Sequence, residues 1–520
     1  PAGMPPPRIA EIIVKHLKAP ETVGSVEVVA GYINFNLSEA WLRALVETLI
    51  SEGAEGATIN IGAGKRAQVE FVSANPTGPL HIGRSRGAMV GDAMARVFEA
   101  AGYAVEREYY FNNAGQQMNN LARSVRYRYY EALGLPPLPE DCDEKGEPYY
   151  KGAYLNDHAA ALVAQRGDSL KGADLLPFKL FAEERMFAMI KATLQRVDIQ
   201  HDVFFNENSL YDSGEVWRTL EALDARGYIY KASAPEVDNT KGEKDEDAPE
   251  AGKAEATWFR SSRFGDEKDR VVVKSNGDPT YTLPDIAYHV NKLDRGFDIC
   301  VNVLGADHFK QAQVVKHGLR ALDRDPSRVH VIFVQIVHLL KDGKITKSST
   351  RAGNFETLDD LIDETSADAV RYMLLARSAD SQMNFDLDLA VKQSNENPVY
   401  YIQYAYVRCA GIFREAALRG VTDDGADLSL LGEAELKFLR RAAQLPDVIE
   451  AAARQFEPHQ IAFYAAEMAN LFHPIFDTVR VLHTEVPPEV AKARLRFFRS
   501  AQTVFKRLLN LMGMSAPETM

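Results

Sequence analysis

The sequence is poor in cysteine and lacks cysteine pairs. Only three cysteines occur among 520 residues, at Cys142, Cys300 and Cys409. Their wide separation offers no CxxC pair for a zinc site, and three thiols cannot complete a disulfide framework. We therefore expect a protein of a reducing, cytoplasmic compartment that holds neither zinc nor disulfides.

Long apolar runs are lacking too. No segment offers the roughly 20 consecutive apolar residues that a membrane-spanning helix requires, and Pro1–Pro7 lacks the basic and apolar blocks of a signal peptide. Apolar residues still make up 46% of the chain, which excludes disorder for most of it. At roughly 100 to 200 residues per domain, we expect about three folded domains and no membrane contact.

The chain also lacks a surplus of basic residues. The chain has 60 Lys and Arg residues against 73 Asp and Glu residues, a formal net charge of −13. Nucleic-acid-binding domains usually carry a basic surplus, so the balance argues against a nonspecific polyanion binder. The last part of the chain differs, because no acidic residue occurs between Lys492 and Met512. Arg494 and Arg496 in this stretch predict a local basic face suited to RNA backbone.

A strand–helix–strand unit is predicted between Ala67 and Phe111. Apolar and polar residues alternate from Ala67 to Ser73, which is typical of a strand. A loop with proline and glycine follows, and then a helical pattern that stops at Gly102. Val105–Phe111 returns as a second strand. Such a unit implies a parallel sheet.

The remaining elements follow from the same patterns. They are a helix at Ile9–Leu17, a strand at Ser25–Phe35, a helix at Glu39–Glu52, and later strands at Val271–Lys274, Asp298–Leu304 and Val329–Val337. Ala114–Arg226 has mainly helical periodicity, and Val237–Glu255 is a charged stretch that we expect to form a flexible surface loop. Thr365–Met520 shows only helical periods, which predicts an all-α domain.

The segment from Ser73 to Arg84 carries the densest chemical signal. His81 and Gly83 stand at the start of a helix, just after a parallel strand, where backbone N–H groups can bind a phosphate. Taken alone, His81 could merely cap that helix. The whole segment resembles the HIGH signature of class I aminoacyl-tRNA synthetases, and its lead-in SANPTGPLH is similar to that of arginyl-tRNA synthetases. Arg84 replaces the second histidine of the signature and keeps a cation near the triphosphate.

A second signature is predicted downstream, in a lysine loop. Lys344–Ser348 resembles the family's KMSKS element, whereas an ungapped alignment of the following residues places Lys347–Thr350 there. We prefer the first register, and Lys347 belongs to both. The resemblance implies that Lys344 and Lys347 act on ATP together with His81.

The resemblance also implies an arginine pocket. Tyr281 and Asp285 match the family's YxxxD element, in which the two side chains receive the guanidinium; a carboxylate suits its rigid fork of donors. Their spacing of four lets both face one ligand at the start of a helix. Glu70, Ser73 and Asn75 match the ligands of the amino acid's other polar groups.

Three further segments complete the candidate site. Gly305, Asp307 and His308 follow an apolar strand, where a doubly wound sheet binds its nucleotide, and the resemblance places them at ATP. The stretch 109–117 is similar to the family's YYxNDAGNQ and should line the pocket. Residues 368–371 resemble a DALR element and 403–408 a QYAxxR element, which makes Tyr404 and Arg408 candidate tRNA contacts.

The resemblance thus implies an α/β fold with three parts. We expect a short α+β tRNA-binding module at residues 1–62, which is either shortened or incomplete because the chain as given starts inside it. A Rossmann-like catalytic domain should follow at 63–364, with an insertion around 117–255. An all-α anticodon-binding bundle should follow at 365–520. The implied activity is ATP-dependent activation of L-arginine and its transfer to tRNA(Arg), with Mg²⁺ in the ATP complex, no organic cofactor, and a monomeric enzyme.

Two other functions stay open from the sequence alone. A small-molecule nucleotidyltransferase shares the HxGx chemistry but has no use for a helical domain of about 150 residues. An RNA-binding paralogue without catalysis would follow if Arg84 and the altered lysine loop had abolished activation.

Overall fold

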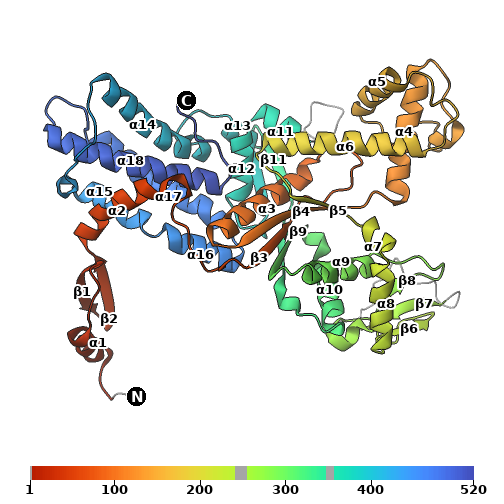
Figure 1. Ribbon diagram of the computed structural model, residues 1–520, viewed down its shortest axis with the longest axis horizontal. Helices are drawn as coiled ribbons and strands as arrows, with labels where there is room; N and C mark the ends of the chain where they lie inside the picture. The colour runs from red at the N-terminus through yellow and green to blue at the C-terminus, as the bar shows by residue number, and fades with distance from the viewer. Residues whose placement is uncertain (1–2, 240–254, 347–356) are drawn as a thin grey trace.

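The computed structural model describes residues 3–239, 255–346 and 357–520. Figure 1 shows an elongated molecule with a helical bundle at one end, a parallel sheet in the middle and two smaller parts at the other end. None of the helices within these three ranges is long and apolar enough to cross a membrane.

The central sheet has five parallel strands in the order β10-β9-β3-β4-β5. The strands are β3 (Arg66–Glu70), β4 (Ala104–Phe111), β5 (Val203–Asn206), β9 (Ile299–Gly305) and β10 (Val329–Val334). The predicted strand–helix–strand unit is confirmed, because α3 (Ile82–Ala100) connects β3 to β4. The predicted alternation is wrong, since β3 lies in the middle of the sheet and residues 67–70 are all buried.

The predicted helical insertion contains one strand that the sequence analysis missed. Helices α4 (Gly115–Ala132), α5 (Tyr154–Arg166) and α6 (Leu176–Arg196) share a core of their own. The next segment, β5, pairs with β4 at the edge of the central sheet. Its four residues are all half-buried, so neither alternation nor a long apolar run distinguished it from a helix.

A small antiparallel sheet follows the insertion. Its strands β6 (Ile229–Ala232), β7 (Ala256–Phe259) and β8 (Arg270–Val273) are linked to the central sheet by α7 (Asn208–Asp212), α8 (Glu215–Ala225), α9 (Thr282–Asp294) and α10 (Phe309–Ala321). The strand predicted at Val271–Lys274 is thus present, but it belongs to this sheet and not to a parallel unit. Of the predicted loop Val237–Glu255, Asp238 pairs with Lys268 and residues 240–254 lie outside the described ranges.

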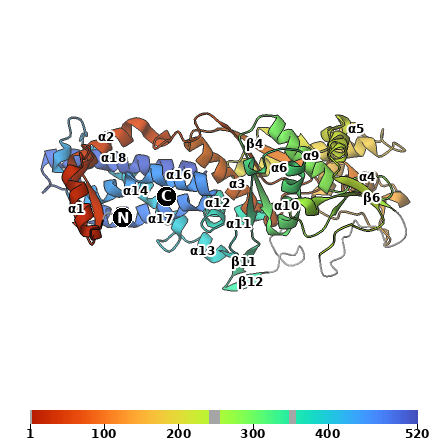
Figure 2. The ribbon, with the colours of Figure 1, turned by 90° about the horizontal axis from the view of Figure 1, so that it is seen from below.

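A third sheet joins the catalytic part to the helices that follow. It contains β11 (Val337–Lys341), β12 (Lys344–Thr346) and β13 (Met383–Asp386). Figure 2 shows β11 and β12 projecting below the molecule. The run predicted as one strand, Val329–Val337, is therefore two strands in different sheets. Thr365–Met520 is also not free of strands, because β13 pairs with β11 in parallel. This strand has only two buried apolar side chains, Met383 and Phe385, which are too few to establish an alternating pattern.

The bundle is built from the C-terminal helices and one N-terminal helix. Short helices α11 (Leu358–Glu364), α12 (Ala367–Leu375) and α13 (Leu387–Ala390) lead into α14 (Pro398–Leu418), α15 (Glu433–Ala442), α16 (Leu445–Gln455), α17 (His459–Thr478) and α18 (Pro488–Leu511). Phenylalanines fill its centre, among them Phe438, Phe472, Phe497 and Phe505. Helix α2 (Glu39–Glu52), found where predicted, packs against α15 and α18.

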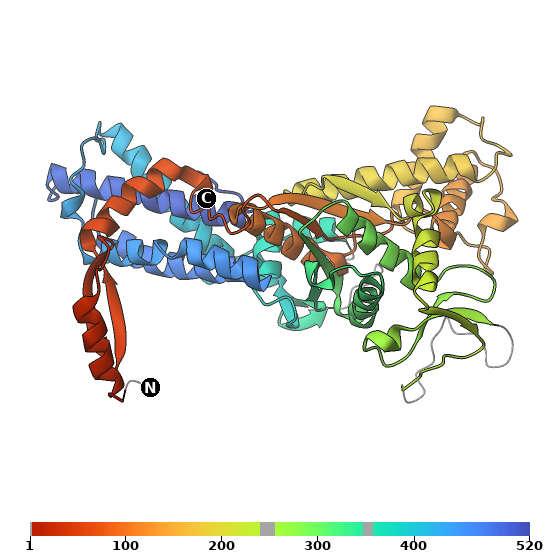
Figure 3. The same ribbon diagram turned by 60° about the horizontal axis from the view of Figure 1, so that its bottom comes forward.

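The N-terminal segment stands apart from the bundle. Helix α1 (Pro6–His16) and strands β1 (Val23–Val29) and β2 (Tyr32–Leu37) extend away from it in Figure 3. The sequence predicted one strand at Ser25–Phe35, whereas the structure has a hairpin. Ala30 and Gly31 form its turn with φ of 52° and 91°, the positive values that two-residue hairpin turns require.

Candidate active site

A cavity of about 650 Å³ opens at the carboxyl ends of the central strands. Parallel sheets place ligands at this edge. Seven of the residues that the sequence analysis selected line it: Glu70, Ser73, Asn75, Arg84, Tyr281, Asp285 and His308. The polar stretch 109–117 also contributes, through Tyr110, Asn112, Gln116 and Gln117. Segments far apart in the sequence therefore meet at one site.

The chain turns sharply where β3 ends. Val72 and Ser73 have φ of 70° and 40°, which few residues other than glycine adopt. The turn lets the Ser73 hydroxyl donate to Glu70 Oε1 at 2.9 Å and accept from the backbone N–H of Tyr110 at 3.2 Å. Backbone strain of this kind concentrates at functional sites, and here it fixes the Glu70 carboxylate beside the cavity.

The histidine of the first signature caps α3. His81 Nδ1 accepts a hydrogen bond from the backbone N–H of Gly83 at 3.0 Å, and both residues are exposed. A Cβ on residue 83 would lie 3.1 Å from that nitrogen, so glycine allows the close approach. Arg84, one residue on, reaches the cavity lining. Of the three signature residues at this helix N-terminus, Arg84 lines the cavity, whereas His81 and Gly83 lie outside its lining.

Asp285 supplies a second negative group of the site. It lies in the first turn of α9 and accepts a hydrogen bond from Gln311 Nε2 at 2.8 Å. Burial raises the pKa of Asp285 to about 7; the Gln311 bond opposes this rise, and the carboxylates of Glu207 and Glu70 add to it. Tyr281, four residues earlier, is 77% exposed and lines the same cavity. A cationic ligand would relieve the crowding of negative charge.

Glu207 is a functional candidate that the sequence analysis missed. It follows the undetected strand β5 and is held by two donors, Tyr110 Oη at 2.7 Å and Asn112 Nδ2 at 2.8 Å. Burial raises its pKa, while these hydrogen bonds oppose the rise. Glu207 lines the cavity with Asp285. Recognition of β5 would have shown that this carboxylate lies at the carboxyl edge of the sheet.

The predicted nucleotide segment lies at the end of β9. His308 lines the cavity, whereas Asp307 is exposed beside it, with 3.8 Å between His308 Nε2 and Asp307 Oδ2. A Cβ on Gly305 would lie 2.4 Å from Asp307 Oδ1, so a larger residue there would displace this exposed carboxylate. In the lysine loop, Lys344 begins β12 and is exposed, while Lys347 lies outside the described residues, so neither register is tested.

The two tRNA candidates on α14 form a stacked cluster. The Tyr404 ring lies 5.4 Å from that of Tyr400, and the Arg408 guanidinium lies 4.5 Å from the centre of the Tyr404 ring. Arg408 also donates to Asp477 Oδ1 at 3.1 Å. Tyr404 and Arg408 are half-buried, so part of this aromatic surface faces solvent.

The basic face predicted on the last helix is largely paired within the protein. Arg496 donates to Glu47 of α2 at 2.8 Å and to Asp423 at 3.3 Å. Arg494 donates to the carbonyl oxygen of Arg480 at 2.6 Å and lies 3.6 Å from Glu435. No acidic residue occurs between Lys492 and Met512, and the sequence did not reveal these partners because they come from other segments.

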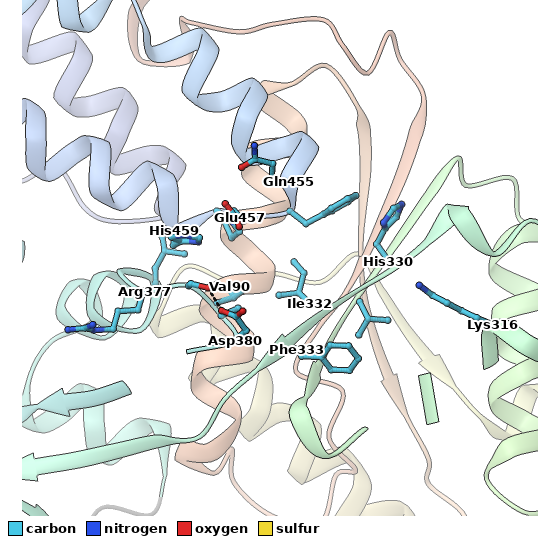
Figure 4. A pocket seen from close by; sticks show the side chains of 16 residues that line it. Val90, Lys316, His330, Ile332, Phe333, Arg377, Asp380, Gln455, Glu457 and His459 are labelled. Atoms are coloured by element: carbon cyan, nitrogen blue, oxygen red, sulfur yellow. Dashed lines mark hydrogen bonds between the residues drawn. The ribbon is translucent and has the colours of Figure 1, made fainter. Parts of the chain in front are cut away.

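A second cavity, of about 360 Å³, lies between the sheet and the bundle. Figure 4 shows Lys316 and His330 on one side, Gln455, Glu457 and His459 on the bundle side, and Arg377 and Asp380 below them. It contains none of the residues selected from the sequence. Its mixed charges indicate no particular ligand.

Similarity to known proteins covers the whole chain. Its residues 1–37 match the family described as arginyl tRNA synthetase N terminal domain, residues 45–233 match tRNA synthetases class I (R), catalytic domain, and residues 402–520 match the DALR anticodon binding domain. The arginine–tRNA ligases of Desulforudis audaxviator and Carboxydothermus hydrogenoformans are 43% and 42% identical to it; they match over 100% and 99% of this chain and 89% of their own lengths.

Solved structures agree in fold. An arginyl-tRNA synthetase structure from Campylobacter jejuni superposes with a TM-score of 0.80 at 31% identity, covering 93% of this chain and 100% of that chain. The arginyl-tRNA synthetase of Thermus thermophilus gives a TM-score of 0.73 at 20% identity, covering 99% and 92%.

Proposed function

The chain belongs to the arginyl-tRNA synthetase family, and on that premise we propose how its cavity activates arginine. Its activity is that of an arginine–tRNA ligase, which uses ATP to convert L-arginine to arginyl-adenylate and then charges the 3′-terminal adenosine of tRNA(Arg). The roles of individual residues below are the proposal.

The observation that carries the proposal is the charge of the cavity. Glu70, Glu207 and Asp285 all line it. L-arginine carries two cationic groups, a guanidinium and an α-ammonium, so a cavity with carboxylates at two places matches both ends of the ligand. Asp285 with Glu207 and Tyr281 would receive the guanidinium, because a carboxylate accepts its planar fork through two hydrogen bonds. Glu70, Ser73 and Asn75 would receive the α-amino acid end.

ATP would bind at the neighbouring edge of the sheet. His81, Gly83 and Arg84 at the start of α3 would face the phosphates, and Gly305, Asp307 and His308 the nucleoside. Lys344 and Lys347 would approach from the lysine loop. Within the described residues no cluster of three or more His, Cys, Asp or Glu side chains could hold a metal ion. Mg²⁺ would enter with ATP, because this ion usually binds through substrate phosphates and keeps several waters.

The chemistry then needs positioning and charge stabilisation. The arginine carboxylate attacks the α-phosphorus in line and pyrophosphate leaves. The 2′-OH of the terminal adenosine next attacks the arginyl carbonyl, loses its proton, and AMP leaves. Negative charge grows on the phosphates in the first step, and His81 and Lys347 would stabilise it. Asp285 and Tyr281 would hold the other end of the substrate so that its carboxylate meets the phosphorus.

The tRNA would contact the bundle. Unpaired anticodon bases would stack near Tyr404 and Arg408, where an aromatic surface is half-exposed. Arg494 and Arg496 would reach RNA phosphates only with the donors that their internal partners leave free.

We also propose domain limits at residues 62 and 364, a monomer, and a cytoplasmic location, the last supported by three free thiols at Cys142, Cys300 and Cys409.

Pyrophosphate exchange tests the activity. With ATP, labelled pyrophosphate and L-arginine, we expect exchange that depends on the presence of tRNA(Arg). Exchange with a different acid and without tRNA would instead indicate a small-molecule nucleotidyltransferase. Absence of exchange with arginine under both conditions would contradict the proposal.

A further inference from the structure

A lysine is buried directly behind the arginine cavity. Lys292 of α9 has no exposed surface, and its ammonium donates to Glu70 Oε2 at 2.6 Å and to Asn302 Oδ1 at 2.7 Å. The same Nζ lies 4.4 Å from the centre of the Tyr288 ring. Lys292 is not in the cavity lining, whereas Glu70 and Asn302 are. The lysine therefore acts on the site only through these neighbours.

The contacts of Lys292 continue across the site as a hydrogen-bond chain. Asn302 Nδ2 lies 2.5 Å from His289 Nε2, and His289 Nδ1 lies 2.8 Å from the backbone carbonyl oxygen of Asp285. Burial, with a contribution from Lys292, lowers the pKa of His289 to about 3, so its ring is neutral. Asn302 can then donate to Nε2, and Nδ1–H donates to the carbonyl of Asp285.

This chain has one direction of donation, from Lys292 outward to Asp285. Such a network allows a single arrangement of its side chains, because a reversed Asn302 amide would place its donors against the ammonium. It links the buried partner of Glu70 with the helical turn that carries Asp285. Buried groups therefore hold the Glu70 carboxylate and the backbone of that turn in place relative to each other.

Glu70 needs such a partner. Only 5% of the residue is exposed, and burying a charge costs free energy unless the charge is paired and hydrogen-bonded. Ser73 contacts Oε1 and Lys292 contacts Oε2, so the two together also set the orientation of the carboxylate.

We propose that Lys292 is a positioning residue for substrate recognition: its ammonium holds and orients the Glu70 carboxylate so that Glu70 binds the α-ammonium of L-arginine. This inference rests on the proposed role of Glu70 in the arginine site. Lys292 itself touches neither substrate.

The test compares two ligands on the full chain by calorimetry. L-arginine and 5-guanidinopentanoate differ only in the α-amino group. The wild-type protein should bind arginine about tenfold more tightly than the analogue, the usual effect of one charged hydrogen bond. In Lys292→Met the ratio of the affinity for arginine to the affinity for the analogue should fall to about one to two. The affinity for the analogue itself and the KM for ATP should each change less than about twofold.

Two further variants separate the inference from its premise. Glu70→Gln should lower the ratio in the same way as Lys292→Met. If Glu70→Gln lowers it and Lys292→Met does not, the role of Lys292 is wrong and that of Glu70 stands. If neither lowers it, the assignment of Glu70 fails and the inference fails with it. Equal weakening of arginine and analogue in Lys292→Met would indicate a packing role and overturn the inference.

A milder change and a matched control complete the design. Asn302→Asp keeps Lys292 and the shape of its neighbour but offers the ammonium a second carboxylate that competes with Glu70. The affinity ratio should therefore decrease again, and an unchanged ratio would contradict the network. Lys392→Met removes a lysine from an exposed pair with Glu396, outside the cavity. It should leave both affinities unchanged, and a lowered ratio in this variant would overturn the assignment to Lys292.

Discussion

Arg371 of α12 donates a hydrogen bond to the carboxylate of Asp92 on α3, and each side chain is only 1% exposed. The same guanidinium donates to the carbonyl oxygens of Met512, at 2.7 Å, and of Val197. Helix α3 begins one residue after His81. A buried ion pair therefore joins the helix that carries the first signature to the C-terminal end of the bundle.

Arg371→Met should destabilise the protein strongly. Removing one partner of a buried pair leaves the other charge unpaired, which costs about 3–5 kcal/mol of unfolding free energy. Arg96 still donates to Asp92 at 2.7 Å, so we expect the lower end of this range. Urea unfolding followed by circular dichroism measures it. Arg419→Met, in an exposed pair with Glu415, should change the free energy by less than about 0.5 kcal/mol, and equal effects would contradict this account.

Asp285→Asn should chiefly raise the KM for arginine. The amide keeps the shape of the side chain but loses the charge that faces the guanidinium, so we expect an increase of about tenfold or more. The KM for ATP should change little. Asp307→Asn is the matched control, because Asp307 lies at the proposed nucleotide segment; it should affect ATP and not arginine. An unchanged KM for arginine in Asp285→Asn would refute the guanidinium assignment.

The affinity for arginine should depend on pH. Burial raises the pKa of Asp285 to about 7 in the free protein, so below pH 7 a proton must leave before the guanidinium can bind. The dissociation constant of arginine should therefore be about tenfold higher at pH 6 than at pH 8 and level off above pH 7. Calorimetry in buffers of different ionisation enthalpy would also detect the released proton. Asp285→Asn should bind arginine weakly with a flatter profile; an equally steep profile would exclude Asp285 as the titrating group.

Tyr404→Ala should weaken tRNA binding without affecting activation at saturating tRNA. Loss of one stacking platform corresponds to about 1–3 kcal/mol per base, or a rise of roughly tenfold in the KM for tRNA(Arg). Tyr406→Phe is the matched control, since this side chain is buried and its hydroxyl donates to Glu518 at 3.2 Å. If both variants change the KM for tRNA equally, Tyr404 has no direct role.

The sequence predicted the long elements well and the short ones poorly. The unit from β3 through α3 to β4 spans enough residues for its periodicity to be clear, and glycine and proline mark its loops. Strands β5 and β13 have four residues each and are defined by neighbours that are distant in the sequence. The hairpin of β1 and β2 was missed because its turn contains alanine where asparagine or aspartate is more typical.

Site residues that lie in a recognisable sequence motif could be predicted. Residues whose role depends on contacts with distant segments of the chain could not. Asp285, Tyr281 and Glu70 lie in segments that match the family and do line one cavity. Glu207 was missed with its strand, and Lys292 gave no sign, since a lysine on a helix is usually exposed. The internal partners of Arg494 and Arg496 likewise depend on packing of α18 against other segments, which periodicity within one helix cannot show.

The most direct test of the central claim is the charging of tRNA(Arg) with labelled amino acids by the full chain. We expect ATP-dependent attachment of L-arginine to the 3′ end, no comparable attachment of L-lysine, and loss of most charging at low arginine concentration in Asp285→Asn. Charging with lysine at a rate similar to that with arginine, or charging with arginine that is indifferent to Asp285→Asn, would contradict the account of an acidic cavity that selects the guanidinium.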